Sequence, residues 1–266
     1  MINRKSREEI KLMRHAGGVV ALVHKAMKEA VKPGISTLEL DEIAARVIKE
    51  NKCIPTFLGY NGFPGCICTS INEEVVHGIP SRERILKEGD IVSIDVGATY
   101  RGLVGDSAWT YPVGKISKEY EDLLKITELA LFNGISKMKD GNILDDVSGA
   151  VEDTATGAAQ NIPNELKNPD GSGKKYGIVR QYGGHGVGRN MHEDPFLFNY
   201  RVNNKTKLKT GFVIAIEPMI NLGADEVVVS AADNWCVSTV DNKASAHFEH
   251  TVAVTDDEPL ILTALE

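Results

Sequence analysis

The chain has 266 residues, enough to bury a sizeable core as one large domain or as two fused halves. Its apolar content of 42% and its net charge of −7 describe an ordinary globular chain without the basic stripe that usually marks nucleic-acid binding. No apolar run is long enough to span a membrane, and the charged residues 1–11 lack the apolar core of a signal peptide. We therefore expect a cytoplasmic protein.

Two helices are predicted at the start of the chain. Residues 6–31 have apolar side chains at helical spacing and begin with a Ser-X-X-Glu capping pattern, and the Pro-Gly pair at 33–34 ends this helix. Ser36 or Thr37 caps the second helix. A Gly-rich stretch at 59–65 and short β-rich runs follow.

The second half of the chain repeats this order of two helices followed by strands. Its helices are predicted over 118–138 and 143–160, and the loop at 139–141 aligns with the loop at 32–34. The second half is longer by about the length of the polar stretch 162–177. The Asn, Pro, Gly and Lys content of this stretch predicts a surface insertion.

The repeat predicts the architecture. We expect a single catalytic domain over residues 1–266, with halves of about 6–112 and 117–256 related by a pseudo-twofold axis. The strand that ends at Asp95 aligns with the strand that ends at Glu217. The pseudo-twofold axis would place these two carboxylates on opposite sides of one central cavity.

A predicted hairpin carries two aspartates. If its loop centres on Tyr100 and Arg101, Asp95 lies directly opposite Asp106, with Cβ atoms about 4.5–5.5 Å apart. Like charges at this spacing destabilise a sheet, and the gap suits a divalent cation bound by both carboxylates. A bulge would shift this register by one residue.

Glu217 and Glu249 also interrupt apolar strand patterns, and no Lys or Arg is interleaved with the four acids. An ionised carboxylate in such a setting needs a positive partner. His185, between glycines, would add a nitrogen ligand. This set suits two divalent ions, with manganese, iron(II) or cobalt favoured and zinc or nickel as further candidates. Strand-end acids that point to solvent are the alternative.

Two such ions generate hydroxide near neutral pH and polarise a carbonyl group. Phosphoester hydrolysis is another reaction of paired metals, but it usually recruits Arg or Lys for the phosphate. Only Arg189 lies beside one of the motifs. The sequence therefore favours amide hydrolysis.

Together these segments resemble type I methionine aminopeptidases of the short bacterial kind, in peptidase family M24, over essentially the whole chain. The resemblance implies the α/β pita-bread fold, in which two pseudo-twofold-related ααβ halves surround a central antiparallel sheet. It also implies removal of the initiator methionine when the second residue is small. The motifs that carry it are EEVVHGIP (73–80), DIVSIDVG (90–97), GDSAWT (105–110), GGHGVGRNMHEDP (183–195), GFVIAIEPM (211–219) and FEHTVAVT (248–255).

The resemblance implies a role for each metal ligand. Asp95 would chelate one ion, and Asp106 and Glu249 would bridge the two. His185 and Glu217 would complete the other site. Glu217 would also act as the general base for a hydroxide, held between the metals, that attacks the scissile carbonyl.

The resemblance further assigns the substrate-binding residues. His192 is expected to stabilise the tetrahedral intermediate, and His77 to guide the scissile amide nitrogen. His247 occupies a position that is commonly Gln in the family, and its contact with the metals stays open. The expected methionine pocket is lined by Tyr60, Phe63, Cys68, Met191 and Trp235.

The expected partners are the N-termini of nascent polypeptides near the ribosome, and the protein is expected to be a monomer without nucleic-acid or membrane partners. Two alternatives stay open. A Pro-directed peptidase of the same fold usually carries an extra N-terminal domain. A non-catalytic binding protein of this fold normally lacks one or more of the metal ligands.

Overall fold

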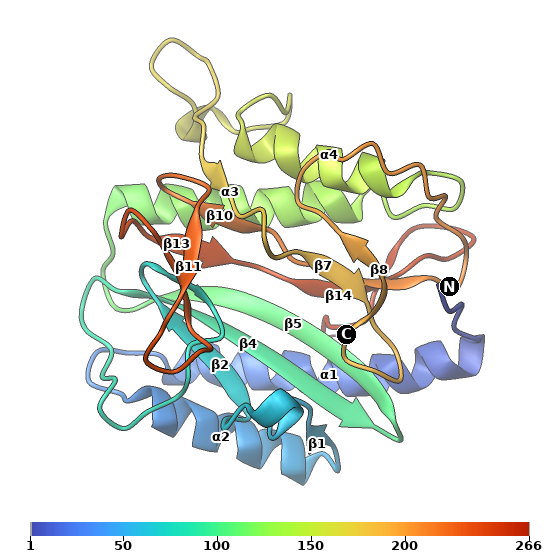
Figure 1. The fold of residues 1–266 in the computed structure, drawn as a ribbon, viewed down its shortest axis with the longest axis horizontal. Helices are drawn as coiled ribbons and strands as arrows, with labels where there is room; N and C mark the ends of the chain where they lie inside the picture. The colour runs from blue at the N-terminus through green and yellow to red at the C-terminus, as the bar shows by residue number, and fades with distance from the viewer. Residues whose placement is uncertain (1, 266) are drawn as a thin grey trace.

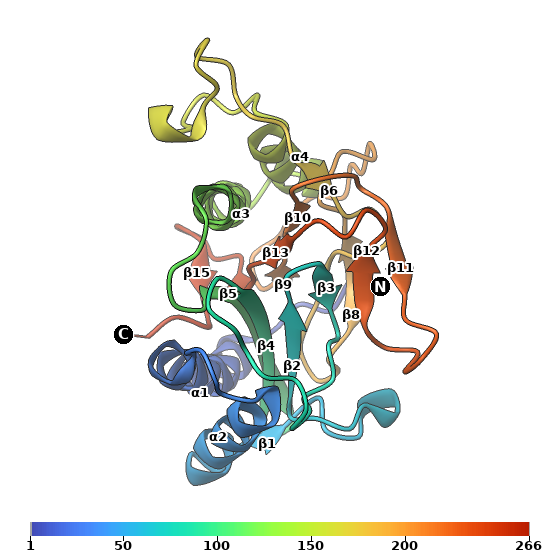
Figure 2. The same ribbon diagram turned by 90° about the vertical axis from the view of Figure 1, so that its left-hand side faces the viewer.

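The computed structural model describes residues 2–265, in which two pairs of helices pack against antiparallel sheets (Figure 1). In this view one pair lies below the strands and the other above them. Seen from the side, α1, α2 and α3 lie to the left of the strands, and β11 and β12 lie to the right (Figure 2). The helices are α1 (Arg7–Ala30), α2 (Thr37–Glu50), α3 (Lys118–Ile135) and α4 (Leu144–Ala155), with short 3-10 turns η1 (Tyr60–Gly62) and η2 (Asn164–Leu166).

Every strand pair within residues 2–265 is antiparallel. One sheet has the order β1-β4-β2 with β5 paired to β4, and another has the order β15-β14-β9-β7-β8. Two smaller sheets have the orders β13-β10-β6 and β11-β12-β3. The strands are β1 (Ile54–Pro55), β2 (Ile67–Ile71), β3 (Glu74–Val76), β4 (Ile91–Tyr100), β5 (Leu103–Pro112), β6 (Gly177–Ile178), β7 (Gly184–Gly186), β8 (Glu193–Leu197), β9 (Val213–Ile216), β10 (Met219–Asn221), β11 (Val227–Val229), β12 (Val237–Thr239), β13 (Ser245–His247), β14 (His250–Ala253) and β15 (Leu260–Ile261).

Capping side chains determine where the first two helices begin. The hydroxyls of Ser6 and Ser36 accept the N–H groups of Glu9 and Glu39, whose carboxylates accept the N–H groups of the two serines in return. These reciprocal bonds satisfy backbone donors that the first turn of a helix leaves free. The predicted starts of both helices are confirmed.

The two later helices are shorter than the sequence predicts. The structure ends α3 at Ile135 rather than at 138, and α4 at Ala155 rather than at 160. Gly157, just beyond α4, has a φ of +79°, the left-handed conformation that commonly terminates a helix. The backbone conformation of this glycine therefore accounts for the earlier end of α4.

Each helix pair packs over its own apolar core. The core under α1 and α2 includes Val20, Leu40 and Ile94, all of which have no exposed surface. The core under α3 and α4 includes Leu131 and Ile216, which are equally buried. The two cores together hold both layers of helices against the strands.

Matching contacts recur in the two halves. The N–H of Gly34 donates to the carbonyl of Leu86 at 2.8 Å, and the N–H of Gly141 donates to the carbonyl of Leu208 at 3.1 Å. Both glycines have left-handed backbones, with φ values of +91° and +90°. These are positions that the sequence alignment pairs, so the contacts support the predicted repeat.

The stretch 162–177 projects from the molecule as the yellow loop at the top of Figure 1. Half of its residues are exposed, in line with the predicted surface insertion, but Ile162 and Leu166 are buried in the core under α3 and α4. These two side chains anchor the base of the loop. Among the helices within residues 2–265, none is long and apolar enough to cross a membrane.

Candidate metal centre

The β4–β5 hairpin positions the first two aspartates. Its two-residue turn is formed by Arg101 and Gly102, which have φ values of +49° and +76°. Turns with two positive φ values match the twist of paired strands. Asp106 therefore lies opposite Gly97, and the prediction that it directly faces Asp95 is wrong.

Asp95 and Asp106 are nevertheless diagonal neighbours on one face of the hairpin. Asp95 lies opposite Ala108, two residues beyond Asp106 on the same strand. Diagonal neighbours remain within reach of each other's side chains, and the charge of Asp95 is one of the causes that raise the pKa of Asp106. The corrected register thus still brings both carboxylates to one place.

A seam of hydrogen bonds joins β5 of the first half to the 249–251 segment of the second. The Thr251 hydroxyl donates to the Asp106 carbonyl at 2.8 Å, and the Asp106 N–H donates to the same hydroxyl at 3.1 Å. The Glu249 N–H donates to the Ala108 carbonyl at 2.7 Å. Since both backbones are fixed, Asp106 and Glu249 are held beside each other.

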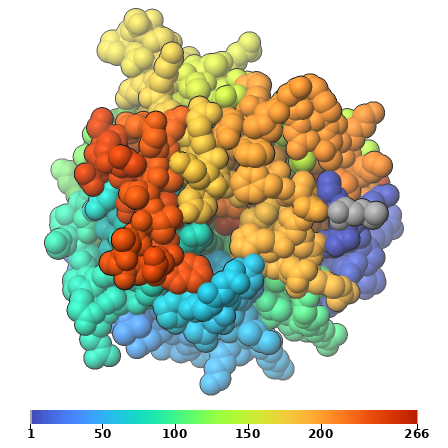
Figure 3. Space-filling model, viewed as in Figure 1, coloured from blue at the N-terminus to red at the C-terminus, as the bar shows by residue number. Residues whose placement is uncertain are grey.

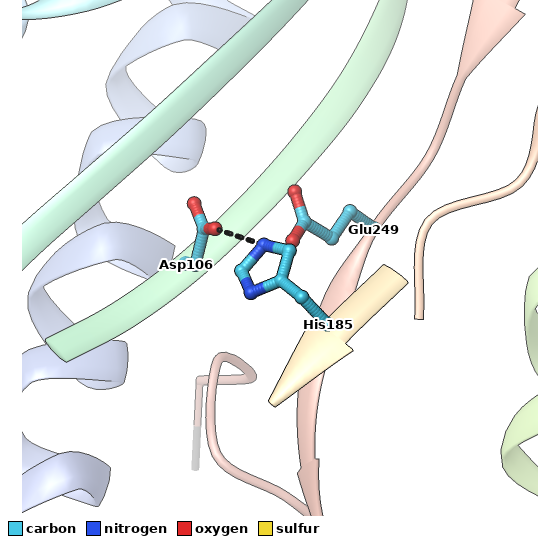
Figure 4. A group of neighbouring side chains, drawn as sticks. All are labelled: Asp106, His185 and Glu249. Carbon is cyan, nitrogen blue, oxygen red and sulfur yellow. Dashed lines mark ion pairs between the residues drawn. The ribbon is translucent and has the colours of Figure 1, made fainter. Parts of the chain in front are cut away.

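His185 brings a nitrogen atom to these carboxylates. Ligand atoms of Asp106, His185 and Glu249 all lie within 4.8 Å of one another (Figure 4). The Nε2 atom of His185 is 3.5 Å from Glu217 Oε1 and 3.7 Å from Asp106 Oδ2. Its Nδ1 is 2.9 Å from the Gly186 carbonyl oxygen, which can only accept, so Nδ1 carries the hydrogen and Nε2 offers a lone pair.

The cluster concentrates negative charge in a poorly solvated place. Burial, followed by the neighbouring carboxylates, raises the pKa values of Asp106 and Glu249 well above their usual range. Burial likewise raises the pKa of Glu217 strongly and is the main cause that raises the pKa of Asp95 to about 7. Burial lowers the pKa of His185 to about 4. The raised pKa values mean that these acids ionise together only beside a positive charge, which a metal ion would supply, while the neutral imidazole of His185 is already in its metal-binding form.

Unpartnered oxygen atoms show that a cation fits this cluster. Asp95 Oδ1, Asp106 Oδ1 and Glu249 Oε1 are buried and have no hydrogen-bond partner among the described residues. Buried polar atoms are normally satisfied, and a set of carboxylate oxygens with one imidazole is a typical divalent-metal donor set. The ligands that the sequence predicts therefore fit a divalent metal.

One cavity of about 690 Å³ lies over the cluster and opens at the centre of the face shown in Figure 3. It brings together every side chain that the sequence predicts for the site. These are the five candidate ligands Asp95, Asp106, His185, Glu217 and Glu249, the histidines His77 and His192, and the pocket residues Tyr60, Phe63, Cys68, Met191 and Trp235. Their individual roles stay predictions.

The pocket residues form an apolar wall beside the metal ligands. Phe63, Cys68 and Met191 are almost fully buried, and the rings of Phe63 and Trp235 meet edge to face at 5.1 Å. This wall is apolar and contains two sulfur atoms. Such a surface suits a flexible, polarizable thioether.

His192 is oriented by a side chain from the opposite wall. Its Nδ1 lies 2.9 Å from the Tyr60 hydroxyl oxygen, and its ring lies 4.3 Å from the ring of His185. Burial lowers the pKa of His192, and burial lowers that of His77 to about 4. Both rings are therefore neutral near pH 7 and can each donate one hydrogen bond.

Two further side chains at the site were not assigned from sequence. Glu193 lines the cavity, although its motif drew attention only to the neighbouring His192. His247 is buried, and within residues 2–265 neither of its ring nitrogens has a hydrogen-bond partner. Its Nε2 lies 3.5 Å from Glu217 Oε2. The i, i+2 spacing to Glu249 was the signal for His247, but spacing alone does not determine side-chain direction.

Comparison with known proteins agrees with this geometry. The family model described as metallopeptidase family M24 matches residues 11–256. Methionine aminopeptidase 1 of Bacillus subtilis is 50% identical over 264 residues, which cover 99% of each chain. Methionine aminopeptidase 1 of Mycobacterium tuberculosis is 48% identical over 99% of this chain and 95% of its own.

Solved structures show the same architecture. The crystal structure of a methionine aminopeptidase from Thermotoga maritima superposes with a TM-score of 0.91 at 38% identity, covering 99% of this chain and 100% of that one. A prolidase from Pyrococcus furiosus shares the fold alone, with a TM-score of 0.70 at 22% identity over 99% of this chain and 66% of that one. The fold is the α/β pita-bread fold, and the chain belongs to metallopeptidase family M24, whose members bind divalent metal ions.

Proposed function

We propose that the protein is a methionine aminopeptidase that removes the initiator methionine from polypeptides whose second residue is small. The observation that carries this proposal is that one cavity contains both a cluster of candidate metal ligands and an apolar pocket. Five candidate metal ligands line it, and an apolar wall suited to a thioether lies beside them. The full-length similarity to methionine aminopeptidases supports the same assignment.

The chain offers ligands for two divalent ions. Asp95, Asp106, His185, Glu217 and Glu249 would hold them. Oxygen-rich donors favour manganese, iron(II) or cobalt, with zinc and nickel as further candidates. When bound, such ions lower the pKa of a water molecule and polarise the substrate carbonyl.

Side chains of the protein then transfer protons and orient the substrate. Glu217 accepts the proton from the attacking water, because its carboxylate borders the cavity beside His185. When the Tyr60 hydroxyl donates to Nδ1 of His192, the hydrogen of that ring resides on Nε2. This N–H can stabilise negative charge on the substrate carbonyl oxygen. His77, on the same cavity wall, guides the amide nitrogen.

The pocket explains the selectivity that we propose. Phe63, Cys68, Met191 and Trp235 would enclose the methionine side chain, and burying its apolar surface would supply much of the binding energy. Tyr60 closes the cavity from the side of η1. A small second residue would fit at the mouth without displacing these walls.

We also infer that the protein acts in the cytoplasm as a monomer, on nascent chains near the ribosome. The support is chemical, because initiator methionine is exposed at the N-terminus of a new polypeptide. The protein itself has 30 basic and 37 acidic side chains, and this excess of acidic groups disfavours a nucleic-acid partner. No membrane partner is proposed.

A paired peptide assay tests the function. Protein loaded anaerobically with manganese or iron(II) is expected to release methionine from Met-Gly-Met and to leave Ala-Pro dipeptide intact. Faster cleavage of the X-Pro substrate would instead identify a Pro-directed peptidase. Binding of metal without cleavage of either peptide would identify a binding protein of this fold.

A further inference from the structure

A buried ion pair joins the start of the chain to the cavity wall. The Lys5 ammonium lies 2.6 Å from Glu193 Oε2, and the side chains of Lys5 and Glu193 are only 5% and 7% exposed. Lys5 precedes α1, whereas Glu193 begins β8 and lines the cavity. Charged side chains are rarely this buried unless they are paired. The contact is therefore a specific, buried interaction of the fold rather than an incidental surface ion pair.

The other carboxylate oxygen of Glu193 accepts hydrogen bonds from the backbone of the loop that precedes it. Glu193 Oε1 accepts the backbone N–H of Arg189 at 2.9 Å and that of Asn190 at 3.2 Å. This loop, residues 188–193, carries Met191 and His192 into the cavity. One carboxylate thus holds the backbone of the loop on one side and the Lys5 ammonium on the other.

Gly188 makes room for the lysine. A Cβ atom at this position would collide with Cε and Nζ of Lys5 and with Oε1 of Glu193. The lysine side chain therefore passes directly over the backbone of the loop. A side chain here would displace the ends of the Lys5 and Glu193 side chains and so disturb the ion pair.

The backbone of Lys5 reaches the other part of the site. Its N–H donates to the Gly211 carbonyl at 2.7 Å, at the turn that leads into β9 and so to Glu217. The N-terminal segment is thereby tied to two separate segments. One ends in a metal ligand and the other carries the substrate-binding residues.

We propose that Lys5 is a positioning residue for the substrate: through Glu193 it holds the 188–193 loop so that Met191 and His192 face the bound methionine. The proposal rests on the proposed function for the roles of those two residues. Buried ion pairs contribute little net stability, because desolvation opposes their attraction. Their value here is that they help to specify one position for a loop that runs between two short strands.

Lys5→Met tests this role, since it keeps the length and apolar stem of the side chain and removes the ammonium. Arg189→Met is the matched control on the same loop. It removes the exposed ion pair of Arg189 with Glu9 at 3.0 Å but keeps the backbone N–H that Glu193 accepts. Lys5→Arg is the conservative variant. Gly188→Ala displaces the ion pair without removing any charge.

Two measurements are made on each full-length, metal-loaded protein. The first is amide hydrogen exchange of residues 188–194, which reports on the loop without substrate. The second is the separate determination of kcat and KM for Met-Gly-Met, with metal content measured in parallel. We expect Lys5→Met and Gly188→Ala to speed exchange in the loop and to lower kcat/KM by roughly 10- to 100-fold, the effect of a small misplacement of binding groups. Metal content should stay unchanged, Lys5→Arg should restore most of the activity, and Arg189→Met should change kcat/KM by less than about 3-fold.

The variant Lys5→Met/Glu193→Gln guards against simple unfolding, because it removes both charges. Glu193→Gln alone is measured alongside it. If the pair acts as a unit, the loss of kcat/KM in the double variant will be smaller than the product of the losses in Lys5→Met and Glu193→Gln. Unchanged exchange in the loop together with unchanged kinetics in Lys5→Met would overturn the proposal, as would equal effects of Lys5→Met and Arg189→Met. If the wild-type protein cleaves no methionyl peptide, the proposed function fails, but hydrogen exchange still tests the positioning of the loop.

Discussion

Replacing Asp95 with Asn should stabilise the metal-free protein at neutral pH. Burial is the main cause that raises the pKa of Asp95 from 3.8 to about 7. A carboxyl group whose pKa is higher in the folded than in the unfolded protein stabilises the fold below its unfolded pKa. That stability is lost as the pH rises through the folded pKa. Stability of the metal-free protein should therefore fall progressively between about pH 4, where Asp95 ionises in the unfolded chain, and about pH 7, where it ionises in the folded protein.

The size of the effect follows from the shift. A change of about three pKa units corresponds to about 4 kcal/mol, at about 1.4 kcal/mol for each unit. Asp95 borders the cavity, where water screens its charge, so we expect a difference of roughly 2–4 kcal/mol. Asn has nearly the same shape as Asp and does not ionise. Above pH 7 the metal-free variant should therefore have a higher free energy of unfolding than the wild type. Near pH 4 the two values should be equal.

Urea unfolding with a chelator present, from pH 4.5 to 8, measures this difference. The variant Asp257→Asn changes an exposed carboxylate and should show no such pH-dependent gain. Saturating manganese should reverse the order, because only the wild type keeps all its ligands and binding stabilises the folded state. A metal-free wild type that is more stable than Asp95→Asn at pH 7.5 would refute the electrostatic reasoning.

Substitutions at four residues test individual side chains. Asp106→Asn or Glu249→Gln should remove metal and activity together, because each carboxylate is predicted to serve both ions, and near-normal turnover with metal analysis would contradict the bridging role. His192→Ala should keep its metal but slow turnover by roughly 10²–10³-fold in steady-state assays, as the loss of an oxyanion donor does, and an empty metal site would contradict that role. His247→Met should weaken manganese binding by roughly 10- to 100-fold in calorimetric titration, since the ring contacts Glu217, whereas His247→Gln should keep a donor and bind normally. Equal affinity in both His247 variants would exclude such a contact.

Local signals in the sequence predicted the helix starts, and they singled out acids that the structure brings together in one cavity. The Ser6 and Ser36 capping boxes depend on side chains only three residues apart, so the pattern is complete within one turn. Acids within apolar strands were also informative. Such residues are costly to bury without a partner, which is why Asp106 and Glu249 could be singled out before any geometry was known.

The hairpin register could not be predicted because it depends on backbone conformation at two residues. Glycine commonly takes a positive φ, so Gly102 was a plausible turn residue, but Arg101 at +49° was not an obvious one. The choice of turn moved the partner of Asp106 from Asp95 to Gly97. Because side chains alternate with a period of two, this shift kept both acids on the same face.

The contacts of Lys5 with Glu193 and of His247 with Glu217 could not be predicted, for a different reason. Lys5 and Glu193 are separated by 188 residues, and no spacing rule relates them. The His247 contact depends on the direction of a side chain next to a break between strands. Tertiary packing determines both, and only a three-dimensional structure reveals them.

The most direct test of the central claim is anomalous diffraction at the manganese edge from crystals grown with manganese under anaerobic conditions. We expect two peaks within the cavity, with Asp106 and Glu249 between them, His185 beside one and Asp95 beside the other. A cavity without anomalous signal at saturating manganese, with the carboxylates protonated and bonded to one another instead, would contradict the metal centre and the activity proposed from it.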